Sequence, residues 1–170
     1  MVIKYRSHVS SKSLLKKKTD IKITKNIWVS HSAYVNYFKR SHNIARLIQV
    51  TLPKFQSLLN LQPNLKFRIA PIRCTQTKGL YYPDSKTVVI DCRLYQERAM
   101  VTLAHELVHA EQYKDKRLQQ RKRKGRWVYF WKGEHTRKKY WDQPWEIEAR
   151  RRQNKLAREV MMLIAEDMTT

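Results

Sequence analysis

The HELVH segment at residues 105–109 constrains the fold more than any other part of this sequence. Its two histidines are four residues apart, so in a helix they lie one turn apart on the same face. The residues around them are mostly apolar: Met100, Val101, Leu103, Ala104, Leu107, Val108 and Ala110. This pattern predicts a buried helix. Because buried imidazoles and carboxylates need partners, we interpret the segment as a metal site rather than a solvated helix face.

The residue types in this segment indicate the chemistry of a zinc hydrolase. Neutral histidine nitrogens bind Zn²⁺, and a site with three protein ligands keeps one position for water, whose pKa falls toward neutrality. Glu106, beside the first histidine, can then take a proton from that water as it attacks a carbonyl carbon. We therefore predict a Zn²⁺ centre on His105 and His109, with Glu106 as the general base.

A third ligand has to come from elsewhere in the chain, and the downstream candidates are His135, Glu146 and Glu148. Pro144 suits the first position of a helix, which predicts that a final helix begins there. In that helix Ala149 shares a face with Glu146, and such a small residue lets the helix approach the motif helix closely. This spacing favours Glu146 as the third ligand and leaves His135 and Glu148 as alternatives.

Four segments together resemble the small gluzincin-type zinc metallopeptidases of phages and bacteria. They are HELVHA at 105–110, WKG at 131–133, Tyr140, and PWEIEA at 144–149. The resemblance covers roughly Gly79 to Arg150. It implies a single zincin-like metallopeptidase domain that hydrolyses peptide bonds of a protein or peptide substrate.

The same resemblance bears on the third ligand. In this family a glutamate in a Glu-x-x-Ala-Asp pattern completes the zinc site, and Glu146 with Ala149 matches that pattern. The match ends at Arg150, where the family has an aspartate that orients a zinc-bound histidine, a role whose loss weakens metal binding. The candidates for a replacement acid are Asp91, Asp142 and Glu148.

His135 supports a rival resemblance, to SprT-like proteases, which use a downstream histidine as third ligand and act on proteins bound to DNA. The sequence around His135 lacks the glycines typical of that group, and the segment around Glu146 matches the gluzincin pattern closely. Tyr140 and His135 are also candidate donors to the charge that develops on the substrate carbonyl oxygen.

The formal net charge is +22, from 36 Lys and Arg against 14 Asp and Glu. Such a surface attracts polyanions, which makes DNA or RNA the first partner to consider besides a substrate. The densest basic run follows the motif, and we expect a solvated loop with a candidate nucleic-acid contact at Arg121, Lys122, Arg123, Lys124 and Arg126. A second hypothesis is therefore a basic nucleic-acid-binding or virion-associated protein whose zinc site is structural and closed by four ligands.

The length of 170 residues predicts one domain. Residues 1–26 carry eight Lys or Arg and one acid, which predicts a loosely ordered basic arm, followed by the metallopeptidase domain at 27–170. Cys74 and Cys92 have no zinc-ribbon spacing, so a reducing, cytoplasmic location is the default, with the virion as an alternative for a phage protein. No stretch is apolar enough for a signal peptide or a membrane span.

Hydrophobic periodicity predicts an α+β fold. We expect a helix over 44–61 that Pro53 kinks or splits, strands at 65–69 and 87–92, and the motif helix over 94–114. An aromatic strand at 127–131 is more typical of a core than of a base-stacking surface. We expect a short antiparallel sheet packed on the motif helix and the C-terminal helix, with residues 87–92 at an edge that could pair with an extended peptide.

Overall fold

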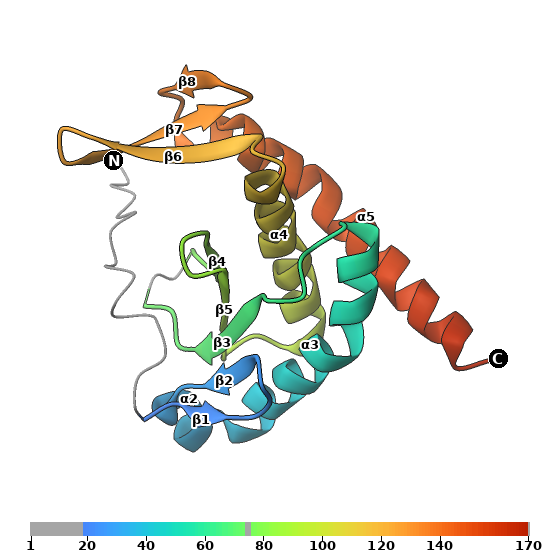
Figure 1. Ribbon diagram of the computed structural model, residues 1–170. Helices are drawn as coiled ribbons and strands as arrows, with labels where there is room; N and C mark the ends of the chain where they lie inside the picture. Colours follow the sequence, from blue (N-terminus) through green and yellow to red (C-terminus); the bar gives the residue numbers. More distant parts are fainter. Residues whose placement is uncertain (1–18, 74–75, 170) are drawn as a thin grey trace.

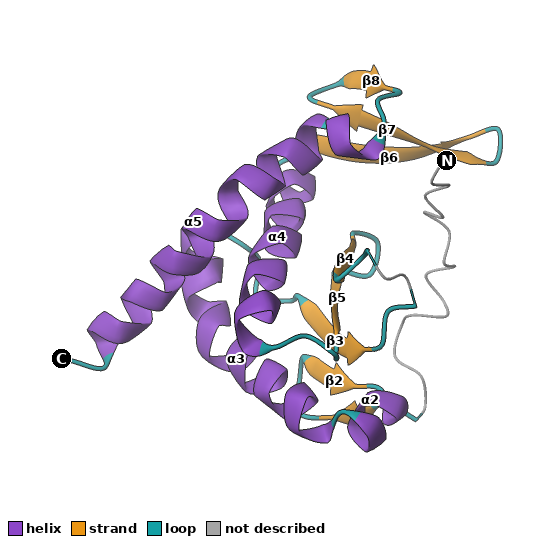
Figure 2. Ribbon diagram, turned by 180° about the vertical axis from the view of Figure 1, so that it is seen from behind, coloured by secondary structure: helices purple, strands orange, loops and turns teal. Residues whose placement is uncertain are grey.

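The computed structural model describes residues 19–73 and 76–169. In these residues the chain has the predicted α+β class, with helices packed against one face of a sheet and a second sheet at one end of the molecule (Figures 1 and 2). The helices are α2 (His31–Asn36), α3 (Phe38–Leu58), α4 (Gln96–Lys114) and α5 (Pro144–Asp167), with a short 3-10 helix η1 (Tyr140–Asp142) before α5.

The larger sheet has five strands in the order β1-β2-β3-β5-β4. These are β1 (Ile21–Lys22), β2 (Ile27–Val29), β3 (Lys66–Ala70), β4 (Gly79–Tyr82) and β5 (Thr87–Asp91). Strand β3 is parallel to both β2 and β5, whereas the two outer pairs are antiparallel. The predicted antiparallel sheet is therefore wrong, because α2 and α3 form a crossover between β2 and β3, and such a connection makes the two strands parallel.

Residues 87–92 do not form an edge of this sheet. Strand β5 pairs with β3 on one side and with β4 on the other, and all five of its residues are buried. The unbroken apolar run at its centre is typical of a strand covered on both faces. The edge beside the motif helix is β4, which has a neighbour on one side only among the described strands.

The second sheet is antiparallel, in the order β6 (Leu118–Arg123), β7 (Arg126–Trp131), β8 (Glu134–Thr136). The prediction of a loop for the basic run is thus wrong in part, because these residues form β6 and the turn that follows it. Lys124 and Gly125 both have positive φ, of 46° and 76°, as the two-residue turns that match the twist of a hairpin require. The aromatic strand is confirmed as β7, although only Phe130 in it is fully buried.

Helix α4 is the centre of the packing. It lies against α3 and α5 on one side and against β4 and β5 on the other (Figures 1 and 2). Its predicted start at residue 94 lies within two residues of Gln96, and α5 begins at Pro144 as predicted. Leu103, Leu107 and Val108 of α4 are fully buried in the core.

Helix α3 continues through Pro53 without being split, and its axis bends in both ribbon views (Figures 1 and 2). A proline cannot donate to the carbonyl four residues earlier, which here belongs to Gln49. Both Pro53 and Gln49 are exposed. The freed carbonyl therefore faces solvent, and the helix persists as a bent one.

The predicted basic arm spans residues 1–26, of which 1–18 lie outside the described residues. Residues 19–26 belong to the sheet through β1. The Asp20 carboxylate also accepts hydrogen bonds from the Arg68 guanidinium of β3, at 2.7 and 3.0 Å. Because an unpaired buried guanidinium is costly, this contact ties Asp20 to the core, and the folded part of the chain begins before residue 27.

Candidate metal centre

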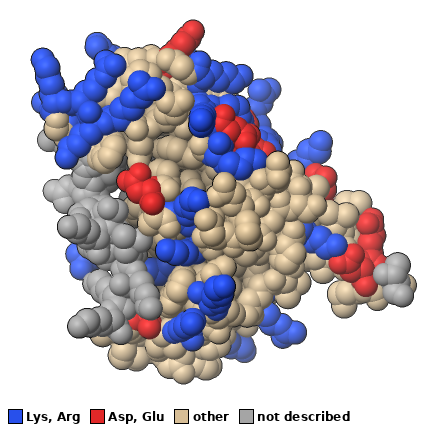
Figure 3. Space-filling model, viewed as in Figure 1, with Lys and Arg blue, Asp and Glu red and all other residues tan. Residues whose placement is uncertain are grey.

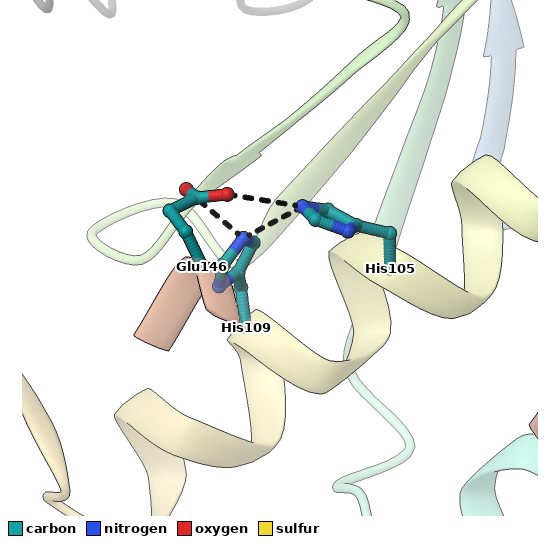
Figure 4. A group of neighbouring side chains, drawn as sticks. All are labelled: His105, His109 and Glu146. Carbon is teal, nitrogen blue, oxygen red and sulfur yellow. Dashed lines mark hydrogen bonds and ion pairs between the residues drawn. The ribbon is translucent and has the colours of Figure 1, made fainter. Parts of the chain in front are cut away.

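Two helices bring three side chains together at one point (Figure 4). His105 and His109 lie on α4, and Glu146 lies in the first turn of α5. The Nε2 atoms of the two imidazoles are 3.1 Å apart. Glu146 Oε2 lies 3.4 Å from His105 Nε2, and Glu146 Oε1 lies 3.4 Å from His109 Nε2. This group could hold a metal ion.

The sequence of α5 explains why its first turn lies so close to α4. Ala149 follows Glu146 by three residues and is completely buried, so no large side chain separates the two helices there. Pro144 occupies the first turn of the helix. Glu146 lies in the same turn, where unpaired backbone N–H groups favour a carboxylate.

Both histidine rings are oriented by glutamine side chains. His105 Nδ1 lies 2.8 Å from Gln153 Oε1, and His109 Nδ1 lies 2.9 Å from Gln112 Oε1. Because an amide oxygen only accepts hydrogen bonds, each Nδ1 is the donor in its contact, and Nε2 is the ring atom that faces the group. The two Nε2 atoms face each other at 3.1 Å, a separation that suits two ligands of one cation.

Gln112 also connects the two helices. Its Nε2 donates to the backbone carbonyl of Trp145 at 3.1 Å, and its side chain is completely buried. Trp145 directly precedes Glu146, so one side chain joins the ring of His109 to the backbone beside the third member of the group. Neither glutamine was predicted from the sequence. The spacing of Gln112, three residues after His109 on the same helix, is the signal that indicates its contact with His109.

None of the three acids considered for this orienting role has it in the structure. The Asp91 carboxylate accepts hydrogen bonds from Arg93. Asp142 is exposed in η1. Glu148 pairs with Arg117 and with a further arginine of α5. The Nδ1 atoms of the two histidines therefore contact amide oxygens rather than the carboxylate that was predicted.

Glu148 belongs to an ion cluster beside the centre rather than to the centre itself. Arg117 donates to Glu148 at 2.7 and 2.8 Å and to Glu111 at 2.7 Å. Arg152 donates to the same two carboxylates. Burial raises the pKa of Glu148, but the two guanidiniums outweigh it and lower that pKa. The cluster ties α4 to α5 two residues beyond His109 and Glu146.

Glu146 is buried and ionised. Burial alone would raise its pKa, but the two histidine rings, each 3.4 Å from one of its oxygens, and a hydrogen bond from Tyr140 lower the pKa of Glu146 to about 2. Its Oε2 atom is buried and has no hydrogen-bond partner in the described part of the chain. A buried carboxylate oxygen without a partner is unfavourable, and a bound cation would satisfy it.

Glu106 is buried as well, with 6% of its surface exposed. The net pKa of Glu106 is raised to about 7, and burial is the largest cause. His105 acts in the opposite direction, the Glu146 carboxylate adds to the increase, and a hydrogen bond from the backbone N–H of Tyr81 lowers the pKa. A carboxyl group with such a pKa can both accept and release a proton near neutrality.

Gly79 allows strand β4 to lie directly on Glu106. A Cβ atom at this position would lie 2.8 Å from both Cγ and Oε1 of Glu106, and 2.6 Å from the Thr102 methyl group. Side-chain atoms do not tolerate such distances, so the glycine is required for space. Strand β4 thus confines Glu106 through Gly79 and Tyr81.

The remaining predicted residues lie around or away from this group. Tyr140 contacts Glu146 through its hydroxyl. His135 is exposed on β8, with its ring 5.7 Å from that of Phe130, and is not a member of the group. Arg150 Nη1 lies 3.9 Å from Glu146 Oε2, while its Nη2 donates to the Trp141 carbonyl at 2.5 Å. The basic residues Arg121, Lys122, Arg123, Lys124 and Arg126 are exposed along the β6–β7 hairpin.

No known protein-family model, curated protein or solved structure matches this chain. Within residues 19–73 and 76–169, no helix has the length and apolar content to cross a membrane. The cytoplasmic or virion location stays a prediction.

Proposed function

We propose that this chain is a zinc-dependent peptidase in which His105, His109 and Glu146 hold the metal and Glu106 is the general base. The observation that carries the proposal is the group of two facing Nε2 atoms and the Glu146 carboxylate, at separations of 3.1 and 3.4 Å, with Oε2 buried and without a hydrogen-bond partner among the described residues. With ligand bonds of about 2.0–2.1 Å, two ligands of a tetrahedral zinc ion are about 3.3–3.4 Å apart. Zn²⁺ held there would polarise a carbonyl group and lower the pKa of water.

Glu106 follows His105 directly and is held between α4 and β4. Its pKa of about 7 suits a carboxylate that takes a proton from the attacking water and passes it to the leaving amine. The contacts with Tyr81 and Gly79 limit its movement. A base that is fixed before the substrate arrives loses little entropy in the reaction.

We propose β4, in place of residues 87–92, as the strand that pairs with an extended peptide substrate. Its outer edge has no neighbouring strand in the described structure, and Gly79 of this strand touches Glu106. Backbone hydrogen bonds along a free edge hold a peptide of any sequence in an extended form. The scissile bond would then lie beside the base.

Of the two donors considered for the carbonyl oxygen, we propose Tyr140. Its hydroxyl already contacts Glu146, whereas His135 is exposed on β8. A hydroxyl in this position can donate to the negative charge that develops as the carbonyl is attacked.

The decisive experiment combines zinc content with cleavage of an unfolded protein by the wild type and Glu106→Gln. We expect one zinc per chain in both and a loss of cleavage by about 100-fold or more in the variant. Glu97→Gln is the matched control, because Glu97 lies exposed on the same helix. Full activity of Glu106→Gln would contradict the mechanism. Bound zinc without cleavage in the wild type would favour the binding protein with a structural zinc site.

A further inference from the structure

The second sheet and the segment after it form the most strongly basic part of the described surface. Residues 118–139 contain nine Lys or Arg and one acid, Glu134. Figure 3 shows Lys and Arg side chains gathered at the end of the molecule where Figure 1 places β6 and β7. The proposed peptidase chemistry does not use these charges.

Strand register places three of these cations on one face. Arg121 lies opposite Val128, Arg123 opposite Arg126, and Gln119 opposite Phe130. Residues directly opposite each other in neighbouring strands share a face, and so do residues two apart in one strand. Arg121, Arg123 and Arg126 therefore lie on the same face as the Phe130 ring; we call this the basic face.

Contacts with Phe130 hold two of the guanidinium groups in place. Arg121 and Arg123 lie over its ring, at 4.9 and 5.5 Å from the centroid, and both remain exposed. Such stacking lowers the entropy that an arginine loses when it binds an anion. Arg123 and Arg126 are like charges directly opposite each other, which destabilises a strand pair. A bound anion would relieve that repulsion.

The opposite face of the sheet covers the start of α5. The rings of Tyr129 and Trp131 lie 5.6 and 6.3 Å from that of Trp145. The basic face therefore points away from the helices. It is an outer surface that a large partner can reach.

We propose that the basic face binds nucleic acid through its phosphate groups. Arginines bind phosphate with two parallel hydrogen bonds. A polyanion also releases counterions when it binds, and its affinity is greatest for a surface with few acidic residues. The exposed large apolar side chains of the described chain all lie outside residues 118–139, which argues against insertion into a membrane surface. Since arginines cover Phe130, we expect phosphate contacts rather than base stacking. DNA and RNA share that chemistry.

The test uses the full chain and fluorescence anisotropy with a labelled 20-nucleotide duplex DNA, the same single strand, and the matching RNA, over a range of salt concentrations. The test variant carries Arg121→Gln, Arg123→Gln and Arg126→Gln. The control variant carries Arg151→Gln, Lys155→Gln and Arg158→Gln, which removes the same charge from exposed positions of α5.

We expect the test variant to bind duplex DNA about 10-fold or more weakly at 0.1 M salt, with its log–log salt slope reduced in magnitude by about 2–3. The control variant should stay within about 2-fold of the wild type. Equal weakening by both variants would overturn the proposal, because net charge and not this face would then govern binding. Tight binding to anionic lipid vesicles without binding to any of the three nucleic acids would also overturn it. The readout requires no peptidase activity, so it can fail while the proposed function stands.

Discussion

The proposed metal centre and the basic face are both rich in polar residues, but they differ in burial. At the centre, His109, Glu106 and Glu146 are buried, and Gln112 and Gln153 orient the rings. On the basic face the cations are exposed. Buried polar groups destabilise a protein unless their geometry is right, whereas exposed charges have little effect on folding. The arrangement of the centre is therefore a more specific guide to function than the arrangement of the basic face.

The largest effect should come from removing a ligand. We expect Glu146→Ala to lower zinc affinity by more than about 100-fold, since losing an orienting residue already lowers it by about 10- to 100-fold. Competition with a chelator measures this. His135→Ala is the control and should leave zinc affinity unchanged, because His135 lies outside the group. Loss of zinc from His135→Ala would instead favour the SprT-like arrangement.

The orienting glutamines should come next. We expect Gln112→Leu and Gln153→Leu each to lower zinc affinity by about 10- to 100-fold. Gln112→Leu should also destabilise the fold by about 0.5–1.5 kcal/mol in thermal unfolding, because it removes the hydrogen bond that joins α4 to the Trp145 carbonyl of α5. The exposed Gln96→Leu, on the same helix, serves as control. Unchanged affinity in both glutamine variants would show that packing alone orients the rings.

A smaller effect is expected from closing the space at Gly79. Gly79→Ala should destabilise the protein by about 1–3 kcal/mol, because the new methyl group overlaps Thr102 and Glu106. Adding Thr102→Ser removes the methyl at 2.6 Å and should recover part of that stability, while the contact with Glu106 remains. Cleavage should therefore stay impaired in the double variant. Full recovery of both would mean that β4 does not confine the base.

Arg150 should give the smallest effect. Its Nη1 atom is buried but lies 3.9 Å from the Glu146 carboxylate, beyond hydrogen-bond distance, so it competes weakly with a bound cation. We expect Arg150→Gln to raise zinc affinity by about 2- to 10-fold. Arg151→Gln removes the same charge from the next, exposed position and should change nothing. Weaker zinc binding in Arg150→Gln would mean that Arg150 supports the centre by holding Trp141.

The sequence predicted features that depend on neighbouring residues, but not contacts between residues that are far apart in the chain. The motif helix and the start of α5 follow from local periodicity and Pro144, and both were predicted within two residues. The pairing of β5 on both edges and the contact of Gln153 with His105 depend on tertiary packing, which local patterns do not encode. Residues 118–123 formed a strand rather than a loop because the register with β7 buries Leu118 and places the arginines outside.

Trp145 belongs to both regions. Its ring packs against Tyr129 and Trp131 of the second sheet, and its backbone carbonyl accepts a hydrogen bond from the Gln112 amide near the proposed metal centre. A partner that shifts β7 therefore also acts on the backbone next to Glu146. Thermodynamic linkage makes any such coupling reciprocal. If a partner bound to the basic face changes the metal affinity of the centre, then metal bound at the centre changes the affinity of the basic face for that partner by the same factor.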